Sequence, residues 1–151
     1  MRYLSKAVLA IVILFNFKAG LSQATGKDSV EAAIEKISQH DIYETSYAVG
    51  FAGHPSMQFE LFKTLVAVAS NDQLLELATH HKNAVVRLYC YQALKKRQAL
   101  IPGYLTEKFR KDETPVETLD GCIGATRKVN SLINEDIFGP FEVEWKGQAK
   151  N

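Results

Sequence analysis

The run Asn83-Ala84-Val85-Val86-Arg87-Leu88-Tyr89-Cys90-Tyr91-Gln92-Ala93-Leu94 carries the clearest structural signal in this chain. Its apolar and small residues recur at helical spacing, which predicts a helix from Ala84 to Arg97 that buries one face. That face holds Val86, Cys90, Ala93 and Leu94. The cluster Lys95-Lys96-Arg97 closes the helix, where three cations complement the negative end of the helix dipole. A helix-terminal role therefore explains these cations better than a recognition patch.

Shorter helices are predicted on both sides of this run. Ser70 and Gln73 have the spacing of a capping box, and they introduce a helix from Asn71 to about His80. Two helices are expected before it, one capped by Asp28-Ser29 and ending near His40, the other opened by Pro55-Ser56. One more is expected after it, from Pro102 to about Lys111. Helices therefore dominate the prediction.

Three other segments have a different periodicity. Polar and apolar residues alternate from Ile42 to Gly53, which indicates a strand or a packed loop. Val116–Leu119 and Cys122–Lys128 flank Asp120-Gly121, a dipeptide that favours a tight hairpin turn. A short helical stretch is expected near Val129–Ile133, and Phe141–Trp145 alternates as a strand would.

The first 24 residues read as a secretion signal. Arg2 and Lys6 precede the apolar run from Ala7 to Phe15, and the short polar stretch Leu21–Ala24 follows. This order is typical of a signal peptide cleaved after Ala24, and the run is shorter than the roughly 20 apolar residues of a membrane span. The alternative is a buried helix of the core, which explains the three-part order less well.

Composition excludes several classes of protein. The chain has 151 residues, 46% of them hydrophobic, which suits one globular domain. Cleavage after Ala24 would remove three of the 18 basic residues and leave 15 against 17 acidic, a net charge of minus two. This balance offers no electrostatic basis for binding nucleic acid, which is not expected as a partner. No membrane span is expected in the mature chain.

The opening run resembles the second helix of a HEAT repeat, in which an acidic or amide residue is followed by Val-Arg, a small residue and then Ala-Leu. With Gly50–Ser56 and the signal peptide, the chain is similar to small exported bacterial HEAT-like proteins. The resemblance implies an armadillo-like helical architecture in which Arg87, Val86, Ala93 and Leu94 are structural residues. Cys90 departs from the pattern, since alanine is usual there. Only one repeat is visible, whereas solenoids need at least about three.

The expected fold class is therefore mainly α, a short HEAT-like helical repeat with a small irregular or β C-terminal segment. The expected domains are a signal peptide over 1–24, a single HEAT-like helical domain over 25–145 and a frayed tail over 146–151.

Residues that could carry chemistry are few. Glu76, His80 and Cys122 are the least implausible members of a site assembled from distant parts of the chain, but His80 and its neighbour His81 are equally explained as polar residues at a helix end. No histidine pair or cysteine pair has metal-ligand spacing, and no nucleophile or phosphate-binding motif occurs. We therefore predict no catalytic, metal or cofactor-binding residues and no cofactor.

Cys90 and Cys122 are the two cysteines of the chain. After export to an oxidising compartment they could form a disulfide between a helix and the following strand, provided that the geometry allows it. Two free thiols are the alternative.

These observations favour an exported, periplasmic or secreted domain that acts as a protein-binding or scaffold module with an unidentified protein partner. A small exported enzyme with an unrecognised site is the alternative, and an inhibitor or immunity-type protein is a further one.

The signal peptide yields a direct prediction. Protein recovered from its native host should lack residues 1–24 and begin at Thr25, because signal peptidase cleaves after small residues such as Ala24. Intact-mass measurement tests this. A soluble protein that retains Met1 would contradict both the cleavage and the exported location.

Overall fold

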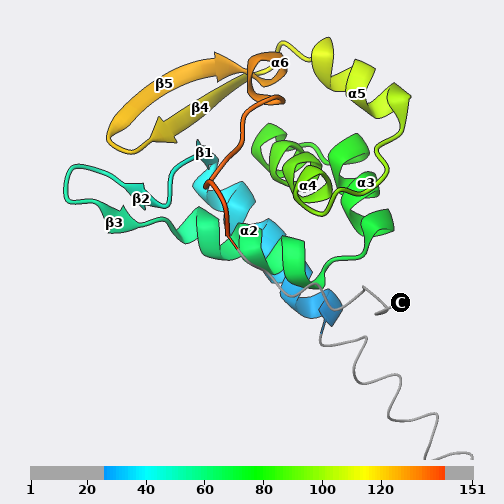
Figure 1. Cartoon of the computed structure of the whole chain (residues 1–151), viewed down its shortest axis with the longest axis horizontal. Coiled ribbons are helices and arrows are strands. Elements are labelled where there is room, and N and C mark those ends of the chain that lie inside the picture. The colour runs from blue at the N-terminus through cyan, green and yellow to red at the C-terminus, as the bar shows by residue number, and fades with distance from the viewer. Residues whose placement is uncertain (1–25, 142–151) are drawn as a thin grey trace, which may run out of the picture.

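The structure is a computed structural model that describes residues 26–141 (Figure 1). The predicted signal peptide and frayed tail lie outside the described residues, as does the predicted strand after Phe141. Residues 26–40 are helical and are called the N-terminal helix below. The labelled elements follow in the order β1 (Ile42–Glu44), β2 (Ala48–Val49), β3 (His54–Pro55), α2 (Met57–Val68), α3 (Asn71–His80), α4 (Ala84–Lys96), α5 (Gly103–Arg110), β4 (Pro115–Asp120), β5 (Ile123–Lys128) and α6 (Val129–Leu132).

Side-chain caps set the starts of the three central helices. The Ser56 hydroxyl accepts the Phe59 N–H at the start of α2, and the Asn83 side chain accepts the Val86 N–H at the start of α4. Ser70 and Gln73 form the predicted capping box before α3. Each cap supplies an acceptor for an N–H group that has no partner inside its own helix. The predicted helix boundaries are confirmed here because these signals act over three residues.

Helix α4 lies at the centre of the core. It is buried on most of its circumference, and its largest buried side chains are Leu88, Tyr89 and Leu94. Helix α3 packs against it across the short 81–83 connection, and α2 covers a second side. The rings of Tyr89, Phe62 and Phe138 pack together at centroid distances of 5.5 to 6.2 Å. Because most residues of α4 are buried, the neighbouring elements have to enclose it.

Strands from both halves of the chain form one three-stranded sheet. Its order is β1-β4-β5, with β1 parallel to β4 and β4 antiparallel to β5. The hairpin predicted around Asp120-Gly121 is confirmed, with Asp120 opposite Ile123 at its end. On the other edge of β1, the Tyr89 hydroxyl accepts the Glu44 N–H and donates to the Glu44 carbonyl, both at 2.9 Å. The central helix thus closes one edge of the sheet.

This sheet corrects the predicted fold class. The protein is a mixed α/β fold and not a mainly α HEAT-like repeat. Helices α3 and α4 do form a helix pair, but the other sides of α4 face α2, α6 and β1 instead of a stacked second pair. The prediction was wrong because the alternation in Ile42–Gly53 does not show which segment a strand there would pair with. The partner of β1 lies about 75 residues further on, and local periodicity carries no information about such a pairing.

The cations that end α4 bind carbonyl groups of other elements. Lys95 donates to the Ile133 carbonyl at 2.7 Å, just beyond α6, and Lys96 donates to the Gly139 carbonyl at 2.7 Å. Arg97 donates to the Leu65 carbonyl in the last turn of α2 at 2.8 Å. The sequence analysis assigned these charges to the dipole of their own helix. In the structure they also bind carbonyl groups of neighbouring segments, which ties the end of α4 to those segments.

Arg87 has the buried, paired position expected of a structural residue. Its guanidinium donates to the carbonyls of His81 and Lys82, both at 3.1 Å, and to the Asp112 carboxylate at 2.7 Å. The Arg87 side chain is only 12% exposed. It therefore joins the α3–α4 connection to the segment between α5 and β4.

Replacement of Arg87 should destabilise the fold. Arg87→Ala leaves the Asp112 carboxylate and two carbonyls without their donor, so we expect a loss of roughly 1 to 3 kcal/mol in the free energy of unfolding. Urea denaturation measures it. Arg110→Ala is the matched control, since Arg110 is exposed and contacts only Glu107 on its own helix; a change within about 0.5 kcal/mol is expected there. Equal effects of the two substitutions would contradict the role of Arg87.

The same pair should make stability depend on pH. Burial raises the pKa of the Asp112 carboxyl, but its hydrogen bonds with Thr114 and Arg87 outweigh burial and bring the pKa below 3.8. A carboxyl with a depressed folded-state pKa stabilises the protein above its unfolded pKa, and this contribution is lost as the pH falls through the folded value. Asp112→Asn should therefore be less stable than the original protein at pH 7, and the difference should shrink as the pH falls through the folded-state pKa of Asp112. Thermal melts across this range test it, and a constant difference would contradict it.

Candidate functional site

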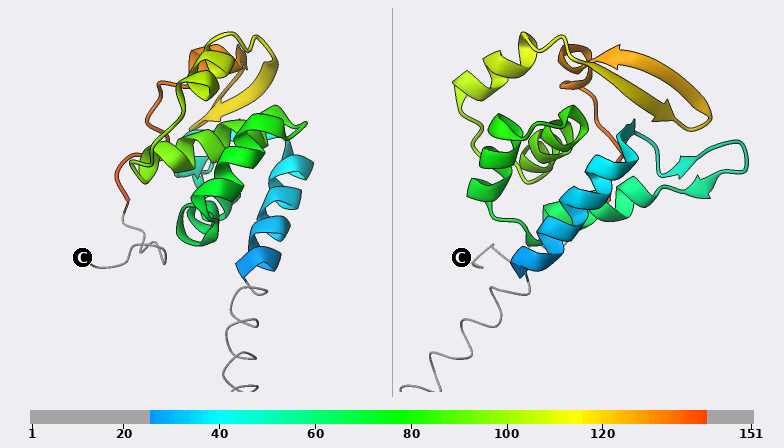
Figure 2. Two further views of the ribbon diagram at one scale, coloured as in Figure 1. Left: turned by 90° about the vertical axis from the view of Figure 1, so that its right-hand side faces the viewer. Right: turned by 180° about the vertical axis from the view of Figure 1, so that it is seen from behind.

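A groove of about 650 Å³ runs between the N-terminal helix and α3. The two helices lie side by side in both views of Figure 2, with the N-terminal helix in blue and cyan. The groove extends along the N-terminal helix from Val30 to Ser38 and along α3 from Asp72 to Leu77, and His81 closes one end. Its volume is within the range of ligand-binding clefts.

The floor of the groove is apolar. Val30 is buried, whereas Ile34 and Leu77 are half-buried against the core cluster. Helix α3 turns Leu74 and Ala78 inward to α4, which leaves Leu77 on its flank. The N-terminal helix likewise buries Ile37 and places Ile34 beside the groove. The groove therefore exists because two amphipathic helices each have an apolar stripe wider than the core can cover.

The rim of the groove is acidic. Glu31 and Glu35 stand one turn apart on the N-terminal helix, and Asp72 and Glu76 stand one turn apart on α3. Like charges at this spacing cost a helix a few tenths of a kcal/mol, and both helices bear this cost on the side that faces the groove. The Lys27 amine lies 3.6 Å from the Glu31 carboxylate, so these two side chains form an ion pair. The groove thus combines an apolar floor with four carboxylates.

His81 does not offset this negative charge at neutral pH. Burial lowers the pKa of its imidazole below the ordinary value, and the Lys82 and Arg87 charges lower it further. The Nδ1 atom accepts the Asn83 N–H at 3.2 Å. At neutral pH the ring is therefore uncharged, and it gives the groove a polar end.

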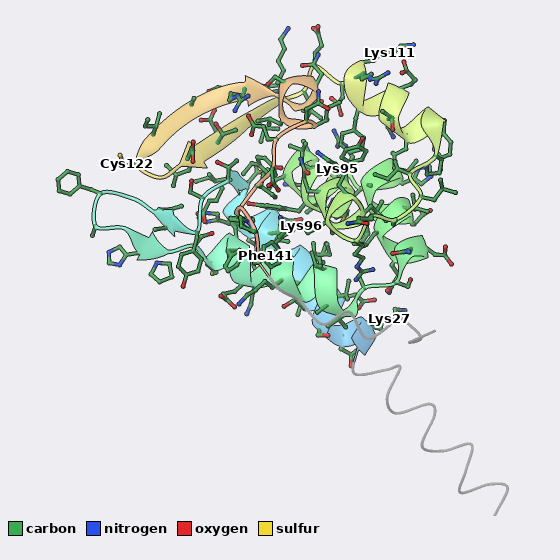
Figure 3. All side chains as sticks on the ribbon, in the orientation of Figure 1. Lys27, Lys95, Lys96, Lys111, Cys122 and Phe141 are labelled. Carbon is green, nitrogen blue, oxygen red and sulfur yellow. The ribbon has the colours of Figure 1, made fainter. Side chains whose placement is uncertain are left out.

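The residues singled out for chemistry do not converge. Glu76 lies on the groove rim, and its carboxylate is 3.9 Å from the His80 ring nitrogen, beyond hydrogen-bonding reach. Cys122 is exposed in the turn between β4 and β5, at the far end of that hairpin (Figure 3). No nucleophile is therefore paired with a base among these three residues.

The two cysteines are both free in the structure. Cys90 is fully buried in α4, and Cys122 is exposed on the hairpin turn, so the disulfide considered from sequence is not formed. Burial also raises the pKa of the Cys90 thiol well above its ordinary value. The predicted structural residues Val86, Ala93 and Leu94 are completely buried beside it.

One cluster that the sequence analysis missed has the residue types of a hydrolytic site. The buried Glu44 carboxylate accepts the Ser56 hydroxyl and lies 2.9 Å from the His40 ring. The order of contacts is wrong for catalysis, because the carboxylate lies between the serine and the histidine, and the Ser56 oxygen is also the acceptor that caps α2. The cluster holds the start of α2 against β1. His40 and Glu44 are four residues apart, but the helix ends between them, so helical spacing does not identify the pair.

Lys95 is a second group whose environment resembles that of a reactive residue. It lines a hollow of about 220 Å³ with Glu135 and Asp136, and burial lowers the pKa of its amine. The amine is occupied, however, by the Ile133 and Glu135 carbonyls at 2.7 and 3.4 Å. Its role is to hold the segment after α6.

Within residues 26–141, no group of three or more His, Cys, Asp and Glu side chains is placed to hold a metal ion. The helices of this same range include none that is long and apolar enough to cross a membrane.

No model of a known protein family matches this chain, and no curated protein matches it. The function inferred below therefore depends on the geometry of the groove and its charges.

Proposed function

We propose that this protein is an exported, non-enzymatic binding module that captures a cationic amphipathic helix of a protein partner in the groove between the N-terminal helix and α3. The observation that supports this is the apolar floor of Val30, Ile34 and Leu77 between two acidic walls. The signal peptide predicted over residues 1–24 supports a periplasmic or secreted location.

The dimensions of the groove suit a helical ligand. Val30 to Ser38 covers about 12 Å of helix axis, roughly two helical turns. A ligand helix of that length presents two or three apolar residues at i, i+3 and i+4 to the floor, which is the usual mode of helix recognition in a groove. Its flanking Lys and Arg side chains would then reach the carboxylates on either wall.

The charges favour a basic ligand over an acidic or neutral one. The pair Glu31 and Glu35 and the pair Asp72 and Glu76 face a ligand from opposite sides, so cations on both flanks of one helix can be matched at once. Complementary charges at the rim of an interface mainly set partner choice and association rate, while the apolar centre supplies affinity. Binding should therefore weaken with salt without being abolished by it.

A synthetic helical peptide of leucine and lysine residues, with the leucines on one face, is the probe for the groove. Fluorescence titration should show saturable binding, and the same peptide with glutamate in place of lysine should not bind. Glu35→Gln/Glu76→Gln should raise the Kd by roughly 3- to 10-fold, the effect of losing two exposed ion pairs. Leu77→Ser should weaken binding further, because it makes the floor polar.

The matched control is Glu60→Gln/Glu107→Gln, which changes the net charge equally at two exposed carboxylates on α2 and α5. It should leave the Kd unchanged. If this control weakened binding as much as Glu35→Gln/Glu76→Gln, the lysine peptide would be responding to overall charge and the groove would not be the binding site.

A further inference from the structure

The tips of the two β-hairpins meet at one end of the molecule. The Gly50 N–H in the turn between β2 and β3 donates to the Gly121 carbonyl in the turn between β4 and β5, at 2.9 Å. The Ser46 hydroxyl donates to the Asp120 carboxylate just behind this contact. Both hairpins extend in the same direction, away from α3 and α5 (Figures 1 and 2). We call residues 47–53 and 121–125 the hairpin-tip surface.

Large apolar side chains of the hairpin-tip surface are exposed to solvent. Phe51 has a relative exposure of 103%, Ile123 of 70% and Tyr47 of 54%. Phe51 is held out by its turn, because Gly50 and Gly53 adopt positive φ angles and the Gly53 N–H donates to the Gly50 carbonyl at 3.1 Å. Exposed aromatic and branched apolar side chains gathered at one extremity of a molecule mark an interaction surface.

The same surface carries no fixed charge. Residues 46–58 contain no Asp, Glu, Lys or Arg, and neither do residues 121–126, although charged residues make up 23% of the chain. The nearest carboxylate is Asp120, whose oxygen accepts the Ser46 hydroxyl at the foot of the surface. The surface therefore offers neither cations for anionic headgroups nor ion pairs that would orient a protein partner.

Several main-chain groups of the tips are hydrogen-bonded within the protein. Besides the bonds of Gly50 and Gly53, the Ser56 N–H donates to the Tyr47 carbonyl at 2.7 Å, and Asp120 pairs with Ile123 across the other turn. This matters because an unpaired backbone group becomes costly where water is scarce. These paired groups add no main-chain cost when the tips enter a less polar medium.

We propose that the hairpin-tip surface inserts into the interfacial layer of a zwitterionic lipid bilayer, with Phe51 and Ile123 reaching the acyl chains and Tyr47 at headgroup depth. Separate projecting side chains suit a fluid phase, which needs no matching pocket, and tyrosine is favoured at membrane interfaces. The lack of cations predicts insertion that is driven by apolar burial and is insensitive to salt. This surface is separate from the groove, so the inference stands or falls independently of the proposed peptide binding.

Cys122 provides a reporter at the site itself. Its thiol is exposed whereas Cys90 is buried, so an environment-sensitive fluorophore can be attached at Cys122 of the full-length chain. A local probe is needed because the apolar run of residues 7–15 can itself associate with lipid. With phosphatidylcholine vesicles, the fluorophore emission should shift to the blue and be quenched by lipids that carry a nitroxide on the acyl chain, and both effects should persist at about 1 M salt, where the Debye length is roughly 3 Å.

Phe51→Ser/Ile123→Ser should weaken this partitioning by roughly tenfold or more, since it removes the two side chains that are buried in lipid. The matched control is Leu100→Ser/Tyr104→Ser, which removes two other exposed apolar side chains, 91% and 62% exposed, near α5; it should have no effect on the Cys122 reporter. An unshifted emission with vesicles would overturn the proposal and leave a protein partner as the explanation of the surface. A shift that requires anionic lipid and disappears in salt would overturn it as well.

Discussion

Burial of α4 is the constraint on which the rest of the structure depends. A helix enclosed by apolar neighbours removes water from the ends of the elements around it, and their carbonyl groups then need donors from the protein. Side chains of α4 supply these donors: Gln92 reaches the Leu132 carbonyl, Lys95 the Ile133 carbonyl and Arg97 the Leu65 carbonyl. The polar residues of this helix therefore fix the positions of α2 and α6 as firmly as its apolar residues do.

The two candidate surfaces lie where this arrangement leaves apolar groups uncovered. The N-terminal helix packs its inner stripe into the core, but Ile34 and Leu77 remain half-buried between it and α3. At the other end, the sheet projects beyond the helices, and all of β5 except the half-buried Arg127 is exposed. We propose different partners for the two surfaces because acidic walls flank one of them and the other lacks charge. A groove that binds peptide and a tip that binds lipid could hold the protein at a membrane while it captures a basic segment.

Local signals predicted much of the secondary structure. The Ser70–Gln73 box, the helix start at Pro55-Ser56 and the turn at Asp120-Gly121 were all identified because each depends on residues within a few positions of one another. The candidate site was predicted less well. Glu76 was noted only as a member of an enzyme site that was kept as an alternative, and its place on the rim emerges only beside Glu31 and Glu35, some 40 residues earlier in the chain. A signal was present in the paired acidic spacing on two predicted helices, although sequence does not show that these helices face each other.

The sequence by itself determined most of the helical segments and the starts of the helices at Met57, Asn71 and Ala84. It also determined the absence of charge from residues 46–58 and 121–126. Only the tertiary structure decided that β1 pairs with β4, that Tyr89 closes the edge of β1, and that the two uncharged turns meet at Gly50 and Gly121. The reason is physical: caps, turns and periodicity act over a few residues, whereas strand pairing depends on how the whole chain covers α4, and many long-range arrangements share the same local pattern.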